Sequence, residues 1–139
     1  MAKVSLSSNL PVSPDSIWKL IGGFNTLPDW HPAVDKCEIE TKDNATFRRL
    51  SLVGGGTIVE KLEKSDDEEH VYTYSIVESP LPVANYSATI RVTESEGGGS
   101  TIEWSGEFDA KGAPEPDAVK VVEGIYQAGL DNLKKMFGG

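Results

Sequence analysis

Hydrophobic and polar side chains alternate between residues 34 and 110, in six short runs separated by turn-forming residues. The runs are VDKCEIET, TFRRLSLV, TIVEKLEK, HVYTYSIVES, ANYSATIRVTE and STIEWSGEFD. Alternation with a period of two is typical of strands that bury one face, and the intervening KDN, GGG, SDDEE, PLP and EGGG are typical of turns. A weaker alternation over residues 3–10 predicts one more strand. The pattern therefore predicts an antiparallel six-stranded meander preceded by a first strand.

Two short helices are predicted between the first strand and the meander. Ser13 can cap the first, with Pro14 at its first helical position, and a Gly-Gly pair at 22–23 ends it. Asn25 can cap the second, and Pro32 ends it because a proline disfavours helical backbone in the preceding residue.

A long helix is predicted over residues 116–137, where apolar side chains recur at helical spacing. One strand, two short helices, six strands and one long helix make an α+β domain. A sheet of this length must curve, and the long helix is the only predicted element large enough to fill its concave face. We expect one domain, residues 1–139.

The hairpin turns align the strands and predict which side chains share a face. Turns centred on Gly54, Asp67, Leu81 and Gly97 all place apolar residues on the same side, which is good evidence for the register. The predicted inward face carries Leu50, Leu52, Ile58, Leu62, Tyr72, Tyr74, Ile76, Tyr86, Ile90, Val92, Ile102, Trp104 and Phe108.

Three polar residues fall on this apolar face. The register pairs Arg48 with Glu60 and places Tyr74 beside Glu60 on the next strand. Charged side chains are rarely buried unless they are paired. The triad is therefore either a structural ion pair with a phenol partner or the polar part of a small-molecule pocket. An Arg partner would also keep Glu60 ionised and make it a poorer base.

Small residues gather near this triad. Ala88 and Gly106 lie beside it on the sheet, and Gly124 and Gly129 lie in the facing helix, where a glycine costs about 1 kcal/mol against alanine. They either leave empty volume for a ligand or allow the helix and the sheet to pack closely.

Trp30 and His31 stand between prolines in the segment NTLPDWHP. They either pack at the end of the second short helix or form one wall of a site. His31 is the residue whose protonation state is naturally useful near neutral pH. His70 follows an acidic turn and is not placed to give His31 a catalytic or metal-binding partner.

Composition narrows the classes of partner. The 139-residue chain of 15.0 kDa carries a formal charge of −9 and has a pI near 4.6, which argues against nucleic acid and against anionic membrane surfaces. The single cysteine, Cys37, gives no disulfide framework, and the start of the chain lacks a signal-peptide pattern. We expect a cytoplasmic protein with no membrane insertion, no metal and no cofactor.

The segments SPDSIWKLI, RRLSLVGGGTIVEKL, YTYSIVESPLPV and TIEWSGEFDA, with the order of elements, resemble the bacterial polyketide cyclase/dehydrase-like family. That family belongs to the helix-grip (SRPBCC) superfamily of START lipid-transfer domains, birch-pollen-type allergens and plant abscisic-acid receptors. The resemblance covers essentially the whole chain. It implies a seven-stranded curved sheet gripping the C-terminal helix around an apolar cavity, with Trp30 and His31 near the cavity mouth.

Three functions follow as hypotheses. The first is binding of a small apolar, aromatic, polyketide-like or lipid-like molecule, at Trp30, His31, Arg48, Ile58, Glu60, Tyr74, Tyr86, Ala88, Trp104, Ile125 and Gly129. The second is a cyclase, dehydratase or isomerase acting through an enolate: Arg48 would stabilise negative charge, Tyr74 would donate a proton, and Glu60 or His31 would accept one. The third is a ligand-gated regulatory protein, although no partner surface is marked.

Overall fold

The computed structural model describes residues 1–138, and the last residue of the predicted domain, 139, lies outside this range. The elements follow the predicted order of one strand, two short helices, six strands and a long helix. They are β1 (Ala2–Leu10), α1 (Pro14–Ile21), α2 (Leu27–Trp30), β2 (Val34–Lys42), β3 (Ala45–Leu52), β4 (Thr57–Asp66), β5 (Val71–Glu78), β6 (Val83–Glu94), a 3-10 turn η1 (Glu96–Gly98), β7 (Ser100–Ala110) and α3 (Glu115–Met136).

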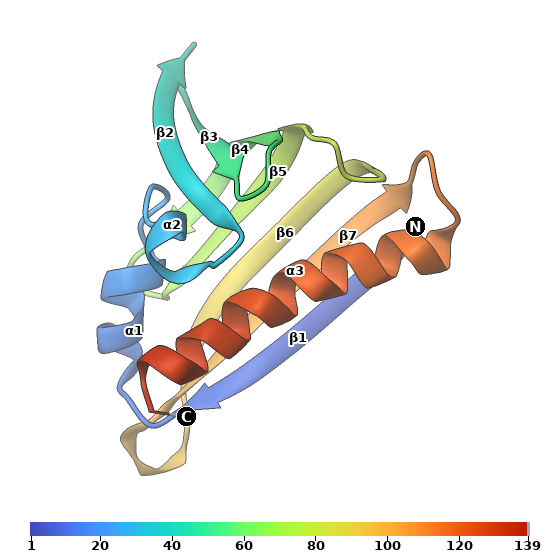
Figure 1. The fold of residues 1–139 in the computed structure, drawn as a ribbon. Coiled ribbons are helices and arrows are strands. Elements are labelled where there is room, and N and C mark those ends of the chain that lie inside the picture. The colour runs from blue at the N-terminus through green and yellow to red at the C-terminus, as the bar shows by residue number, and fades with distance from the viewer. Residues whose placement is uncertain (139) are drawn as a thin grey trace.

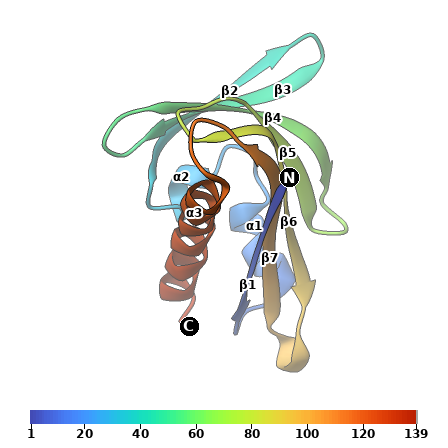
Figure 2. The same ribbon diagram turned by 90° about the vertical axis from the view of Figure 1, so that its right-hand side faces the viewer.

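All seven strands form one antiparallel sheet in the order β1-β7-β6-β5-β4-β3-β2. The first strand therefore pairs with the last, and the others follow as a meander. Figure 1 shows α3 lying along β1 and β7, and Figure 2 shows the sheet curving over the helix, with α1 and α2 beside it. This is the predicted α+β helix-grip arrangement of a curved sheet around a long C-terminal helix.

The first short helix forms as its capping residues predict. Ser13 precedes α1, its hydroxyl accepts a hydrogen bond from the backbone N–H of Ser16, and Pro14 occupies the first turn. The cap of α2 differs from the prediction. Thr26, not Asn25, stands at the N-cap, and the Thr26 hydroxyl turns back to donate to the carbonyl of Leu20 at 2.5 Å.

The predicted register is confirmed in most of the sheet. The pairs Arg48–Glu60 and Leu50–Ile58 form between β3 and β4, and Ile90 pairs with Trp104 between β6 and β7. Between β5 and β6, Tyr74 pairs with Ala88 as predicted.

The predicted pairing of β4 with β5 is wrong by two residues. Glu60 lies opposite Ile76 and not Tyr74. The turn is centred between Glu68 and Glu69 and not on Asp67, since Asp66 pairs with Val71, and an irregularity between Leu62 and Lys64 then shifts the register by one residue. Such bulges add an unpaired residue to one strand and displace the side chains that follow. A similar shift in β6 separates Tyr86 from its predicted backbone partner, Phe108, although their rings still stack with centroids 6.1 Å apart.

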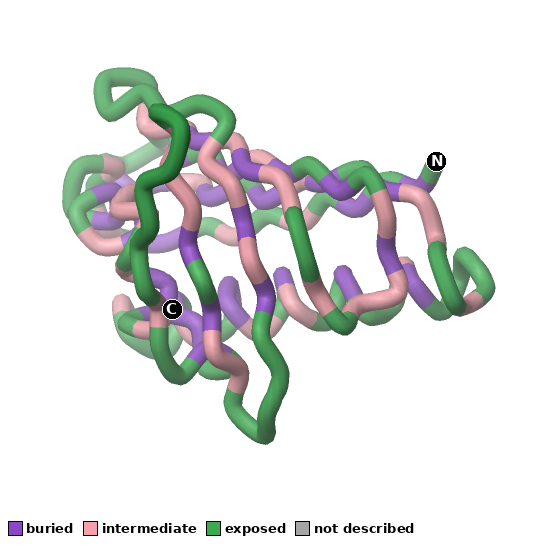
Figure 3. Tube along the Cα trace, turned by 90° about the horizontal axis from the view of Figure 1, so that it is seen from above, coloured by how far each residue is buried: buried purple, intermediate pink, exposed green. Residues whose placement is uncertain are grey.

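Figure 3 shows buried positions alternating with exposed ones along the strands, the pattern expected of a sheet with one covered face. The buried set joins this face to one side of α3, whose Val122, Tyr126, Leu130 and Leu133 are at most 2% exposed. Among the described residues no helix combines the length and apolar character needed to cross a membrane.

Candidate functional site

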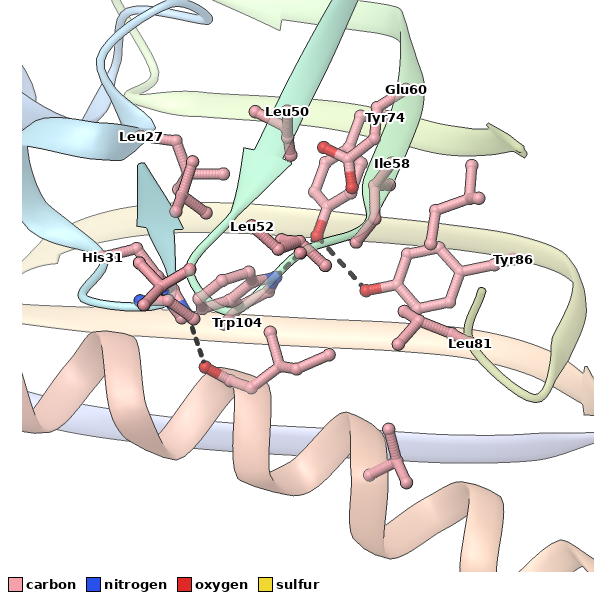
Figure 4. Close-up of a pocket in the computed structure, with 17 residues that line it drawn as sticks. Leu27, His31, Leu50, Leu52, Ile58, Glu60, Tyr74, Leu81, Tyr86 and Trp104 are labelled. Atoms are coloured by element: carbon pink, nitrogen blue, oxygen red, sulfur yellow. Dashed lines mark hydrogen bonds between the residues drawn. The ribbon is translucent and has the colours of Figure 1, made fainter. Parts of the chain in front are cut away.

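A cavity of about 230 Å³ lies between the sheet and α3. Its wall is mostly aliphatic and aromatic, with Glu60, Tyr74, Tyr86 and His31 as polar or titratable members (Figure 4). The remaining lining residues are Leu27, Ala33, Val34, Leu50, Leu52, Val53, Gly55, Ile58, Ile76, Leu81, Trp104, Val121 and Ile125. Strands β2 to β7, α2, the three loops that follow α2, β3 and β5, and the middle of α3 thus contribute to one space.

His31 ties the segment after α2 to the long helix. Its Nδ1 accepts a hydrogen bond from the backbone N–H of Ala33 at 3.1 Å, so Nε2 carries the proton and donates to the carbonyl of Ile125 at 2.7 Å. Burial lowers the pKa of His31, and the bond to Ile125 opposes this only in part. The ring is therefore a neutral link between backbone groups, with both nitrogens already in use.

Three aromatic rings pack against the same part of α3. Trp30 lies 5.6 Å from Trp104 between ring centroids, and the His31 ring meets Trp104 edge-on at 6.0 Å. A methyl group at Gly129 would lie 2.8 Å from the His31 ring and 3.0 Å from each indole. Gly129 therefore allows the helix and the sheet to pack closely. Of the two alternatives that the sequence left open, it is this one and not the empty volume for a ligand.

The other small residues behave in two ways. Gly106 makes room for the Tyr126 hydroxyl, which a side chain at position 106 would overlap. Ala88 is 2% exposed, within the core. At Gly124, by contrast, an added methyl group would meet no described atom within 4 Å.

Arg48 is 1% exposed and makes an ion pair with Glu60. Its Nε donates to Glu60 Oε1 at 2.7 Å, and its Nη1 donates to the carbonyl of Phe24 at 3.0 Å. The guanidinium carbon lies 4.1 Å above the Phe24 ring, a cation–π contact. The phenol within hydrogen-bonding distance of Arg48 is that of Tyr72, whose hydroxyl oxygen lies 3.5 Å from Nη1. The sequence predicted Tyr74 in this place.

Glu60 turns one carboxylate oxygen to Arg48 and lines the cavity. Both Nε and Nη2 of Arg48 lie 2.7 Å from Oε1, whereas no described group donates a hydrogen bond to Oε2. Burial raises the pKa of Glu60, and the Arg48 guanidinium opposes that rise. The sequence argument considered only the guanidinium, which favours the ionised carboxylate, and left out the opposing effect of burial.

A chain of hydrogen bonds joins four aromatic side chains behind and along the cavity wall. Trp104 Nε1 donates to the Tyr74 hydroxyl at 3.1 Å, the Tyr74 and Tyr86 hydroxyls are 3.2 Å apart, and Tyr86 is bonded to Tyr126. Burial raises the pKa of Tyr74 and Tyr86 well above the usual value, so both hydroxyls stay protonated.

This chain of hydrogen bonds has one more donor hydrogen than it has hydrogen bonds. One N–H and three O–H groups share three hydrogen bonds, and an indole N–H can only donate. One hydroxyl hydrogen therefore has no acceptor within the chain. Tyr126 is fully buried and does not line the cavity, whereas Tyr74 and Tyr86 do. We therefore assign the unpaired hydroxyl hydrogen to Tyr74 or Tyr86, where it faces the cavity.

The structure places seven of the predicted ligand-contacting residues on the cavity wall. They are His31, Ile58, Glu60, Tyr74, Tyr86, Trp104 and Ile125. The other four, Trp30, Arg48, Ala88 and Gly129, are not among the lining residues. Trp30 and Gly129 fill the helix contact, and Arg48 stands behind Glu60.

Several lining residues were not predicted as site residues. Leu50, Leu52 and Ile76 belong to the inward face that the register identified, so the pattern already held that signal. Val121 was missed, although it lies four residues before the predicted Ile125 and shares its helix face. Leu81 lies in the PLP turn that helped to identify the resemblance. Within residues 1–138, no three His, Cys, Asp or Glu side chains gather as metal ligands would.

The sequence and the fold match a known family. Residues 1–138 match the family model described as polyketide cyclase / dehydrase and lipid transport. The chain belongs to this family. The description of the polyketide cyclase / dehydrase and lipid transport family spans catalysis and carriage of apolar molecules, so membership is compatible with ligand binding and with cyclase-like chemistry and names neither a ligand nor a reaction.

Solved structures agree with this family assignment over almost the whole chain. The XoxI protein from Bacillus cereus is 40% identical, with a TM-score of 0.93, covering 99% of this chain and 96% of its own. An uncharacterised protein from Bacillus thuringiensis gives the same identity and TM-score, covering 99% and 100%. A Thermobifida fusca protein, 23% identical with a TM-score of 0.82 over 99% and 94%, shows the shared fold.

Proposed function

We propose that this protein binds a small, mostly apolar molecule of one or two rings in the cavity between the sheet and α3. The observation that carries this proposal is the cavity itself, about 230 Å³ of space between the sheet and α3. A cavity of about 150 Å³ lined by apolar side chains is large enough for benzene. The size therefore suits a compact ring system better than an extended lipid chain.

The wall has the composition expected of such a site. Ligand pockets combine a mainly hydrophobic lining with a few polar groups that fix the orientation of the ligand. Here Ile58, Ile125 and Trp104 supply apolar contacts, while Tyr74 and Glu60 supply polar atoms. The membership of a family described by cyclisation and lipid transport supports the same class of guest.

The geometry gives the enolate mechanism less support than binding. To act as a base through Nδ1, its unprotonated nitrogen, His31 would have to give up the hydrogen bond from the Ala33 N–H. Arg48 does not line the cavity, and its Nε and Nη1 donate to Glu60 and Phe24. We therefore advance binding alone as the proposed function.

Calorimetric titration with 2-naphthol, with a blocking variant and a matched control, tests the proposal. Val121 lines the cavity and is 38% exposed, so it borders the opening. Val121→Trp should abolish the binding heat by filling the opening. Lys120→Trp places the same side chain at an exposed neighbouring position that is not part of the lining, and it should bind normally. Equal binding by both variants would place the ligand elsewhere.

A further inference from the structure

We propose that the cavity selects a guest whose polar end is an uncharged hydroxyl, and that it discriminates against carboxylates of the same shape. This inference rests on the proposed function and deepens it by naming the chemistry of the guest. It differs from the expectation at sequence level, in which Arg48 would orient a carbonyl, carboxylate or enolate oxygen.

The first argument concerns the charge on the wall. Among the described residues that line the cavity, Glu60 is the one acidic or basic side chain of fixed charge, since His31 is held neutral by its two backbone hydrogen bonds. Arg48 lies behind Glu60 and is 1% exposed. A guest therefore meets the carboxylate before the guanidinium, and like charges brought together in a desolvated site repel each other strongly.

The carboxylate is ionised in this arrangement because its partner cannot lose its charge. Arginine stays protonated in proteins, and a buried guanidinium without a counter-charge is strongly destabilising. The 2.7 Å contacts from Arg48 to Glu60 Oε1 supply that counter-charge. They leave Oε2 as an acceptor without a described donor.

The second argument concerns the tyrosines. The chain from Trp104 to Tyr126 has one hydroxyl hydrogen to spare, at Tyr74 or Tyr86 on the cavity wall. The wall thus presents one unused acceptor, Glu60 Oε2, and one unused donor. A guest hydroxyl can donate and accept at once. An ether can only accept, and a carboxylate can only accept while adding a negative charge.

Three naphthalenes with the same ring system separate these possibilities by calorimetric titration at about pH 8, where carboxylates are ionised. The probes are 2-naphthol, 2-methoxynaphthalene and 2-naphthoate. We expect 2-naphthol to bind about tenfold or more tightly than 2-naphthoate. The methyl ether should lie between them because it leaves the Glu60 oxygen without a donor.

Glu60→Gln gives the reciprocal test. It removes the negative charge from the wall and leaves Arg48 as the nearest charge, so the preference for 2-naphthol over 2-naphthoate should shrink or reverse. The double variant Arg48→Met/Glu60→Gln carries neither charge. It serves as the second comparison if the single variant is poorly folded, and it too should lose most of the discrimination.

The outcomes distinguish the two proposals. Binding of all three naphthalenes with 2-naphthoate equal or tightest in the native protein would overturn the inference and leave the proposed function standing. Failure of all three to bind would overturn the proposed function and this inference with it. A preference for 2-naphthol that survives unchanged in both Glu60 variants would also overturn the inference, because the discrimination would then come from another group.

Discussion

Replacing Gly129 with alanine tests how α3 is seated on the wall of the cavity. In the structure a methyl group at this position would lie 2.8 Å from the His31 ring and 3.0 Å from the rings of Trp30 and Trp104. Carbon atoms pack best at about 3.5–4.0 Å, so either the rings or the helix must move. Extra atoms forced into a packed interior cost about 1–3 kcal/mol.

Gly124 provides a matched control in the same helix. Alanine at this position would meet no described atom within 4 Å. Gly124→Ala should therefore raise the free energy of unfolding by about 1 kcal/mol, the difference in helix propensity. Gly129→Ala should gain the same helix propensity, but the clash with the three rings should lower its free energy of unfolding. The difference between the two variants isolates the contact of α3 with the three rings, about 1–3 kcal/mol in favour of Gly124→Ala.

Urea denaturation followed by far-ultraviolet circular dichroism measures both free energies of unfolding. The slope with denaturant should be the same in both variants, so that the midpoints report stability alone. Two variants of equal stability would refute the packing that we describe around Gly129. The same result would remove the argument that His31 is a structural link between the α2–β2 segment and α3.

Four further variants probe the buried polar groups. Arg48→Met should cost about 3–5 kcal/mol of unfolding free energy because it leaves Glu60 buried without a partner, and adding Glu60→Gln should recover most of that loss; no recovery would argue against the ion pair as the cause. Tyr86→Phe should cost about 1–3 kcal/mol, since the Tyr126 hydroxyl loses its described partner, and an unchanged midpoint would contradict the hydroxyl chain. Because burial lowers the pKa of His31 below its ordinary 6.5, the folded protein binds fewer protons there than the unfolded chain does, so the stability of the native protein should fall as the pH drops below 6.5. His31→Gln should flatten that pH dependence, and an unaltered pH profile would contradict its assignment to His31.

Most of the sheet could be predicted because its turns and its alternation carry the same information. The three glycines at 54–56 take positive φ values, and they join β3 to β4 in the register that pairs Leu50 with Ile58. A slip by one residue would have turned the apolar side chains outward. The predicted face was therefore constrained by several turns at once.

The pairing of β4 with β5 could not be predicted in the same way. The irregularity between Leu62 and Lys64 lies close to an exposed, charged hairpin end, where side chains on either face remain in water. Alternation gives no signal there, so an extra residue in one strand goes undetected. The change of register reaches the site, because Glu60 lies opposite Ile76 and not Tyr74.

The sequence predicted which residues form the site better than it predicted how these residues are bonded. The apolar face identified Tyr74, Glu60 and Trp104 as inward-pointing, and all three line the cavity. Whether His31 is free or bonded depends on the carbonyl of Ile125, which is 94 positions away in the chain. Such long-range contacts with backbone atoms leave no pattern in the sequence.

Nuclear Overhauser effects between bound 2-naphthol and the methyl groups of the isotope-labelled protein test the central claim most directly. The account predicts contacts from the naphthalene protons to methyl groups of Ile58, Leu52 and Ile125, which line the cavity. Ile39 and Val77, which are 43% and 58% exposed, serve as control methyl groups outside the lining. Contacts confined to these exposed methyl groups, with none to the three cavity residues, would contradict the account.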